Sequence, residues 1–443
     1  MLRLLHLASR PAAYGLMCLF LLAPGISLAQ SQNVPDEEMA ILEQVNQLQS
    51  KTTPAQASAW RHNLNYTYQH SQLAFGGLRQ EPQQQQAQFT SRYDAEWDSD
   101  YSGHLAYTLS WREDTAGRQL DGRVQEAYLS FRQGAQAITE IGLSKLRFGI
   151  AYGYNPNDVL ANYQHNSSRS FDPADQREAR SGIFALRQQW FLPSVTLGLV
   201  YLPALYRPVT DFAMARYPAP NSQQQLLFSL SPRPLDTAGR WQAQILAQTK
   251  FAGEFNLGFN MSGLLSDASV WHLEWLGSQQ SADCRQFNLN WQVSKLTCAA
   301  TKQTRQRLAT GINYSFANKL SILAEYYYDN RAPDQAFWTQ FLANSVADTT
   351  AYYAYLNQQQ QLTGKHAWLV HANWQDVVAH WDLSAYWQQN RGAEQTRQFL
   401  QLRYRQQHAD YSLQFLRASQ LALANQPALA RQSHWQFSWR WYF

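Results

Sequence analysis

The chain has 443 residues and a formal net charge of only +4, so it offers no strong excess of charge to attract nucleic acid. Aromatic residues make up 14% of it, with 16 Trp and 24 Tyr, yet abundant Gln, Ser and Asn keep the mean hydropathy at −0.48. Beyond the first thirty residues no run of about 18 apolar residues predicts a membrane helix, whereas many aromatics in a polar chain are typical of a membrane barrel with a wet interior.

The first 29 residues have the pattern of a secretory signal peptide. Arg3 and Arg10 precede an apolar run from Ala12 to Ala23. Ser27-Leu28-Ala29 then provides a small-x-small cleavage site before Gln30. The run is too short for a stable membrane helix, and no Cys follows the cleavage site to carry a lipid anchor. The sequence therefore predicts export and removal of residues 1–29.

Residues 30–57 are expected to form a periplasmic segment with one short helix in PDEEMAILEQVNQLQSK. Ile41, Leu42, Val45 and Leu48 share one face of that helix. It could plug the barrel or bind a partner, but packing on the barrel rim is the simpler interpretation.

From residue 58 to the end, apolar and polar residues alternate in segment after segment. Leu308, Thr310, Ile312, Tyr314 and Phe316, for example, alternate with small or polar residues. This period of two predicts strands, and short turns such as 317–319 interleave with long polar loops such as 151–180. We expect an all-β fold, a closed antiparallel transmembrane β-barrel over residues 58–443.

Eighteen strands are predicted in that barrel, and sixteen is the alternative. They begin near residues 58, 86, 103, 123, 138, 181, 195, 222, 240, 254, 268, 307, 320, 365, 380, 397, 410 and 434. The region from 222 to 278 is the least regular, because Pro232 and Pro234 interrupt it.

The segments RVQEAYLSF and LSKLRFGIAYG, followed by the loop that starts YNPND, resemble a family of porin-like outer-membrane proteins of largely unassigned function. The matching residues lie between positions 123 and 158: Arg123, Glu126, Tyr128, Leu129, Lys145, Gly149, Gly153, Asn155, Pro156 and Asp158. This resemblance implies a channel or transporter for small organic molecules.

Charged residues on the polar faces are candidates for the lining of the lumen. Alternation places Glu126 on the polar face of one strand and Lys145 and Arg147 on that of its neighbour, so these groups can approach one another. Other candidates lie towards the C-terminus: Glu325, Asp382, Arg403, Arg405 and Arg440. Such charges could select permeating solutes or simply brace the wall as ion pairs, and neither interpretation is preferred.

Cys284 and Cys298 remain after the signal, which contains Cys18, is removed. A pair of cysteines in an exported chain predicts a disulfide, with two free thiols as the alternative. No zinc spacing, phosphate loop or dinucleotide motif is present, so no metal or cofactor is predicted.

The loop residues His165 and Ser167 are similar to the His and Ser of outer-membrane phospholipase barrels. Pro156 and Pro173 nearby argue against the regular strand that such a site requires, so we do not expect an enzyme. DQAFWTQFLAN (334–344) is predicted to form a loop helix that either constricts the lumen or packs on the loop itself. The glutamine runs 83–86 and 358–361 are interpreted as solvated loop tips.

The chain ends in HWQFSWRWYF, with aromatic residues at alternate positions up to Phe443. We expect this strand to close the barrel against the first one. Trp439, Trp441 and Phe443 resemble the C-terminal signal that the outer-membrane barrel assembly machinery recognises.

The sequence thus predicts a Gram-negative outer-membrane barrel for passage of a small organic or charged solute. The alternative is a plugged barrel that serves a surface complex, and a lipase is least favoured. The expected partners are membrane lipid, the assembly machinery and the solute. The sequence leaves the oligomeric state open.

Overall fold

The computed structural model describes residues 59–75, 78–115, 117–161, 164, 168, 170–205, 223–233, 239–250, 253–280, 303–342, 362–392, 395–419 and 429–443. All of them belong to one of two compact units, Gln44–Phe443, and that unit is the one discussed below. The signal peptide, the predicted N-terminal helix, Cys284, Cys298, His165 and Ser167 lie outside the described residues.

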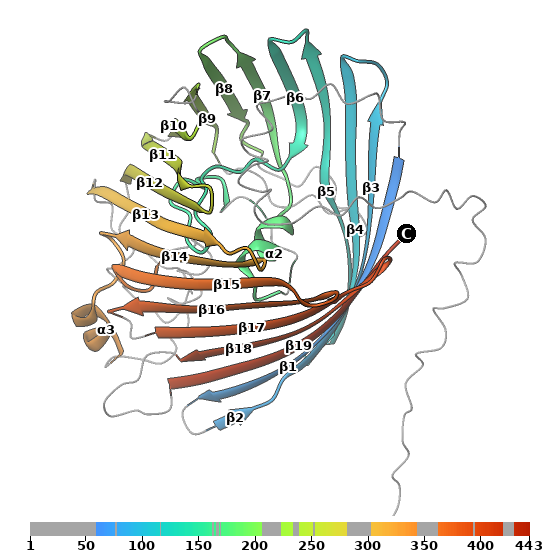
Figure 1. The fold of residues 1–443 in the computed structure, drawn as a ribbon, viewed down its shortest axis with the longest axis vertical. Helices are drawn as coiled ribbons and strands as arrows, with labels where there is room; N and C mark the ends of the chain where they lie inside the picture. The colour runs from blue at the N-terminus through green and yellow to red at the C-terminus, as the bar shows by residue number, and fades with distance from the viewer. Residues whose placement is uncertain are drawn as a thin grey trace, which may run out of the picture. The chain divides into compact units, whose positions relative to one another are not determined.

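The described residues form one closed antiparallel sheet, drawn in Figure 1. Its strands are β1 (Ala59–Phe75), β2 (Leu78–Gln80), β3 (Gln83–Glu96), β4 (Tyr101–Asp114), β5 (Gly117–Gln133), β6 (Ala137–Ser144), β7 (Ile183–Phe191), β8 (Val195–Leu202), β9 (Gln225–Pro232), β10 (Trp241–Lys250), β11 (Glu254–Ser266), β12 (Ser269–Gln280), β13 (Gln303–Ser315), β14 (Leu320–Asp329), β15 (His366–Val378), β16 (Trp381–Arg391), β17 (Gln395–Arg405), β18 (Ala409–Ser419) and β19 (Leu429–Tyr442). β2 is a three-residue continuation of β3 along the same edge of β1, so the wall has eighteen strands.

The barrel closes between the first and last strands, as predicted. β1 and β19 pair from Asn63↔Tyr442 to Phe75↔Leu429. The N–H of Phe443 donates to the carbonyl of His62 at 3.0 Å. Eighteen strands rather than sixteen are present because Pro232 falls on the last residue of β9, where it breaks no central ladder. β5 begins at Gly117 instead of near 123, because the β4–β5 hairpin extends further than its hydrophobic pattern.

The outer face of the barrel is apolar along its whole girth. Exposed aliphatic side chains such as Ile141, Ile245 and Val370 face outward, with 43–50% of their surface accessible. Exposed aromatic side chains gather at the ends of the strands that carry short turns, including Trp97 and Tyr314. An apolar band bordered by a belt of aromatic residues is the surface that a membrane barrel presents to lipid.

No helix in the described part of the chain is long and apolar enough to cross a membrane. The two helices that are described lie in long loops. α2 (Pro173–Glu178) follows β6, and α3 (Gln335–Leu342) follows β14.

α3 confirms the helix predicted over residues 334–344. Its anchor is Trp338, which is fully buried and donates from Nε1 to the carbonyl of Thr363 at 2.7 Å. Phe337 of the same helix is half-buried.

The interpretation of residues 83–86 as a solvated loop tip is wrong. These glutamines begin β3 and pair with β1, for example Gln86 with Thr67 and Gln84 with Gln69. Glutamine is a weak strand former, but an inward position in a polar lumen suits its amide.

Candidate functional site

The loop after β6 folds into the barrel instead of away from it. Residues 145–182, called the inward loop below, include α2, and Figure 1 shows α2 inside the ring of strands. Leu146 and Leu160 of this loop are buried against the inner faces of β7 to β10, where Leu202 and Leu227 are also fully buried. This apolar contact fixes the first part of the inward loop to one side of the lumen.

Glu274 on β12 receives three backbone N–H groups of the inward loop. Its Oε1 accepts from the N–H groups of Ile150 and Ala151, and its Oε2 accepts from that of Asn157 at 3.3 Å. Glu274 is fully buried. Charge-assisted hydrogen bonds of this kind are stronger than bonds between neutral groups, so Glu274 is a principal anchor of the loop.

Glu325 on β14 continues this anchoring along the chain. Its carboxylate accepts from the N–H of Tyr152 at 2.8 Å and from that of Gly153 at 3.1 Å. The hydroxyl of Tyr327 donates to Glu325 and also accepts from the N–H of Gly153 at 3.1 Å. His272 Nε2 lies 2.8 Å from the same carboxylate.

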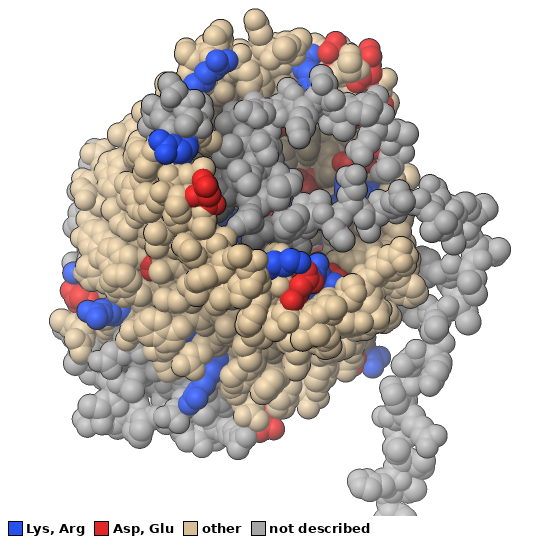
Figure 2. Space-filling view, viewed as in Figure 1, with Lys and Arg blue, Asp and Glu red and all other residues tan. Residues whose placement is uncertain are grey.

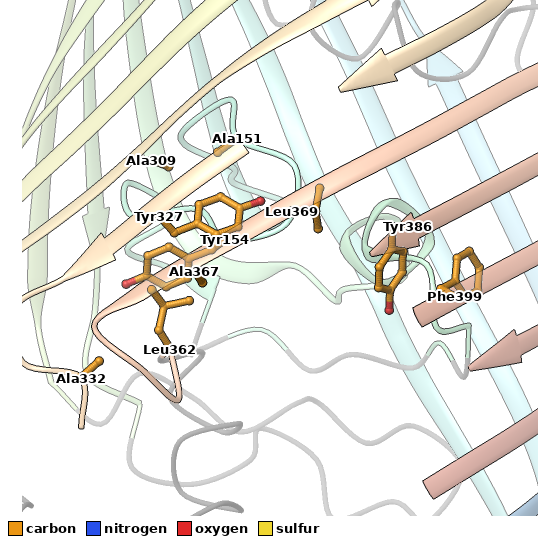
Figure 3. Close-up of a cluster of buried hydrophobic side chains, with 10 residues drawn as sticks. All are labelled: Ala151, Tyr154, Ala309, Tyr327, Ala332, Leu362, Ala367, Leu369, Tyr386 and Phe399. Carbon is orange, nitrogen blue, oxygen red and sulfur yellow. The ribbon is translucent and has the colours of Figure 1, made fainter. Parts of the chain in front are cut away.

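Tyr154 inserts between the inward loop and the wall. Figure 3 shows its ring beside that of Tyr327, and their centroids are 5.8 Å apart in an edge-on arrangement. Its hydroxyl donates to Asp329 at 3.2 Å, and Arg305 Nε holds the same carboxylate at 3.0 Å. Burial beside Asp329 raises the pKa of Tyr154, so this hydroxyl stays protonated.

Two glycines of the sequence motif explain why the loop can lie so close to the wall. Gly149 has a φ of +86°, and an added Cβ would lie 2.0 Å from Asn155 Oδ1. An added Cβ at Gly153 would lie 2.5 Å from the Tyr327 hydroxyl oxygen. Asn155 also caps the turn, since its Oδ1 accepts from the N–H of Asp158 at 3.0 Å. The motif therefore encodes this anchored turn.

The second half of the inward loop reaches the opposite side of the barrel. Gln414 on β18 accepts from the N–H of Phe171 at 3.1 Å and donates to Ser170 Oγ at 2.8 Å. The hydroxyl of Tyr386 on β16 donates to the carbonyl of Phe171 at 3.2 Å. The loop is thus fixed on both sides and crosses the lumen.

Asp172 lies at the centre of this crossing. It caps α2 by accepting from the N–H of Ala174 at 2.8 Å, and it accepts from the Tyr152 hydroxyl at the same distance. Tyr152 stacks on His371 of β15, with ring centroids 4.5 Å apart. Burial, together with repulsion from Asp175, raises the pKa of Asp172 to about 6.

Ion pairs hold α2 and its flanks together. Arg147 pairs with Glu178, and Arg180 pairs with Asp158. Burial acts to raise the pKa of Glu178, but the Arg147 guanidinium outweighs it and lowers that pKa. Arg177 donates to the carbonyl of Tyr152 at 3.0 Å.

The inward loop leaves one wall of the lumen uncovered. Inward side chains on β8 to β15 are almost completely buried beneath it, as Leu202, Glu274 and Leu369 show. By contrast, the inward side chains Asn65 on β1 and Gln86 and Gln88 on β3 remain half-exposed. Figure 2 shows a hollow on the side of the barrel where Figure 1 places β3, β4 and β5.

The charged residues predicted to line the lumen separate into three groups. Glu126 and Lys145 do approach each other, with Lys145 Nζ 3.3 Å from Glu126 Oε2, and Glu126 also lies 3.5 Å from His104 Nε2. Arg147 instead pairs within the inward loop. The Glu325 side chain has no exposed surface, because it holds the loop backbone.

The remaining candidates form pairs near the short turns. Arg405 contacts Asp382 at 2.6 Å, and Arg403 contacts Asp410 at 2.7 Å. Arg440 faces Asp410 in the strand register of β18 and β19, and its side chain lies beside Tyr442. Trp439, Trp441 and Phe443 project from the outer face of β19, where Trp441 and Phe443 are 41% and 60% exposed.

The sequence-based reasoning missed Glu274, Tyr327 and Asp172 as residues of the site. Glu274 lies between two tryptophans in WHLEWL, a segment in which a carboxylate on the inner face could have drawn attention. In the described part of the chain, no group of three His, Cys, Asp or Glu side chains is placed to hold a metal ion.

The fold and its crossing loop define a class, the closed eighteen-stranded antiparallel barrel. No family model and no curated protein matches this chain. Solved structures do match it in fold. The outer membrane protein OpdK of Pseudomonas aeruginosa aligns with a TM-score of 0.52 and 8% identity, over 87% of this chain and 98% of its own.

OprD and OpdL from the same organism are similar to a comparable degree. OprD has a TM-score of 0.51 at 9% identity, over 89% of this chain and 98% of its own. OpdL has a TM-score of 0.52 at 10% identity, over 87% and 98%. At such low identity the similarity establishes the shared fold.

Proposed function

We propose that this protein is a Gram-negative outer-membrane channel for small hydrophilic solutes. The observation that carries the proposal is the uneven filling of the lumen. The inward loop has contacts on strands from β7 to β19 and leaves half-exposed polar positions such as Asn65 on β1 and Gln86 and Gln88 on β3. A closed barrel of this size is wide enough for a water-filled path even when a loop narrows it.

The apolar outer face and the belt of aromatic residues at its border support a membrane location. OpdK, which shares the fold, is named as an outer membrane protein. Within this proposal, residues 1–29 are the signal peptide, 30–57 the periplasmic segment with its helix, and 58–443 the barrel. Trp439, Trp441 and Phe443 present the assembly signal, and a Cys284–Cys298 disulfide stays a prediction.

The charged candidates along the path receive different roles in this proposal. Glu126 with Lys145, Arg405 with Asp382, and Arg403 with Asp410 border the path as neutralised pairs. Arg147 and Glu325 position the inward loop, and Arg440 lines the path near the short turns.

The proposal is tested by reconstituting the purified, folded barrel. We expect stepwise KCl currents in planar bilayers and swelling of proteoliposomes in small neutral solutes. The dense hydrogen bonding of the inward loop favours the second candidate, a plugged barrel for a surface complex. A folded barrel that gives neither currents nor swelling would refute the channel and leave the plugged barrel as the favoured candidate.

A further inference from the structure

The uncovered wall of the lumen has an unusual composition. On β1 the five inward positions from Asn63 to Ser71 are Asn, Asn, Thr, Gln and Ser, and on β3 the four from Gln84 to Thr90 are Gln, Gln, Gln and Thr. We call these nine positions the amide wall. They carry many hydrogen-bonding groups and no ionisable group.

The amide wall is continuous across the two strands. Asn65 is the cross-strand partner of Gln88, and Thr67 is that of Gln86. Facing residues of an antiparallel pair lie about 5 Å apart, and the next inward residues follow about 7 Å along the strand. Each amide presents both donors and an acceptor, so the wall offers closely spaced groups of both kinds.

Long amides of this wall have spare hydrogen-bonding capacity. Within the described part of the chain no side-chain hydrogen bond is formed by Gln86 or Gln88, and the buried Gln84 Nε2 has no acceptor. Gln69 differs, because its Nε2 donates to Ser71 Oγ at 3.1 Å. Gln86 and Gln88 are therefore the groups available to a passing solute.

Three pairs of charged side chains near the amide wall neutralise one another, whereas Arg92, the inward residue after Thr90 on β3, forms no ion pair among the described residues. Arg61 pairs with Asp94, Arg123 with Asp121 at 2.8 Å, and Lys145 with Glu126 at 3.3 Å. A charged solute gains little from these three pairs, because each of their cations already has an anion beside it and releasing it would leave that anion unpaired. A neutral solute rich in hydroxyl groups loses nothing electrostatically and can exchange its water for amide hydrogen bonds.

We propose that the amide wall selects neutral polyhydroxylated solutes, that is, sugars, over charged solutes of equal size. This inference rests on the proposed channel function and names its substrate class. The glutamines of β3 act as a hydrogen-bonding track beside the inward loop.

Uptake into proteoliposomes tests the proposal with glucose, glucuronate and glucosamine, three rings of similar size that differ in charge. KCl conductance of the same preparation is measured in parallel. We expect glucose to enter several-fold faster than either charged sugar. Faster entry of glucuronate or glucosamine would overturn the proposal while leaving the channel function intact.

The double variant Gln86→Met/Gln88→Met removes both amides at nearly constant side-chain length. We expect the ratio of glucose flux to KCl conductance to fall about fivefold or more, the loss expected for one or two hydrogen bonds to a neutral solute. Gln398→Met is the matched control, because Gln398 is exposed on the outer face of β17. Heat-modifiable migration shows that each variant is a folded barrel.

An unchanged ratio in the folded double variant would overturn the proposal. Absence of KCl current in the wild-type barrel would instead refute the channel function, and the sugar track with it. The two failures are distinguished by the KCl measurement.

Discussion

Replacing Glu274 by alanine should detach the inward loop from the barrel wall. The change removes the acceptor for the N–H groups of Ile150, Ala151 and Asn157. A buried donor left without an acceptor costs about 1–3 kcal/mol, so three of them, partly rescued by water, cost roughly 3–6 kcal/mol. That shifts the ratio of detached to attached loop by about 10²- to 10⁴-fold.

The barrel wall itself should survive this change. β12 pairs with β11 and β13 through backbone groups that the Glu274 side chain does not supply. We therefore expect a folded barrel that shows a larger conductance level in single-channel recordings, rare in the wild type and frequent in Glu274→Ala. External protease should cut the variant within residues 145–182 faster than the wild type.

Two further variants make the test specific. Glu274→Gln keeps one carbonyl oxygen and should lie between wild type and alanine. Glu140→Ala removes a wall carboxylate that pairs with Arg187 at 3.0 Å, and it should leave current levels unchanged. If Glu274→Ala shows wild-type current levels and wild-type cleavage, the reasoning that Glu274 anchors the loop is refuted.

Three other changes give distinct expectations. Gly149→Ala should detach the loop as Glu274→Ala does, at a cost of about 1–3 kcal/mol in the free energy of loop attachment, because Gly149 has a positive φ and Asn155 lies close to it. Gly117→Ala is the control in the same recordings, because Gly117 also has a positive φ but has open space around it. Equal effects of the two variants would contradict the steric argument. The pKa of Asp172 is raised to about 6, so its contribution to the stability of the attached loop is present at low pH and is lost as pH rises through 6. The larger conductance level should therefore be more frequent at pH 7.5 than at pH 5. Asp172→Asn should abolish that difference. Deletion of Phe443 should lower the amount of folded barrel in the outer membrane without blocking export, as judged by fractionation and blotting, whereas Phe316→Ala at another exposed aromatic should not; normal amounts after the deletion would count against the assembly signal.

Much of the wall could be predicted from the sequence because its signal is local. Inward and outward side chains alternate with a period of two on every strand, and a barrel buried in lipid on one face and wet on the other makes that period visible. The strand starts near 195, 254 and 320 agree with β8, β11 and β14. The predicted start of the last strand, near 434, is five residues too late. β19 begins at Leu429, because it includes polar residues that precede the aromatic pattern.

The contact between Glu126 and Lys145 was also predictable, since a short hairpin brings β5 and β6 together. The expected strand ends too early to include Lys145 and Arg147, however, because β6 stops at Ser144 and both residues belong to the inward loop. The role of Glu325 was not, because alternation places a side chain on the inner face but does not say what else occupies the lumen.

By itself the sequence predicted the strands and their alternating faces, because these depend on residues that are near one another in the chain, and it favoured eighteen strands over sixteen. Only the tertiary structure decided where the inward loop goes and which wall stays open. Glu274 lies 117 to 124 residues from the amides that it holds, so no local pattern links them. The amide wall likewise becomes a surface for solutes only because the loop is anchored to other strands of the barrel.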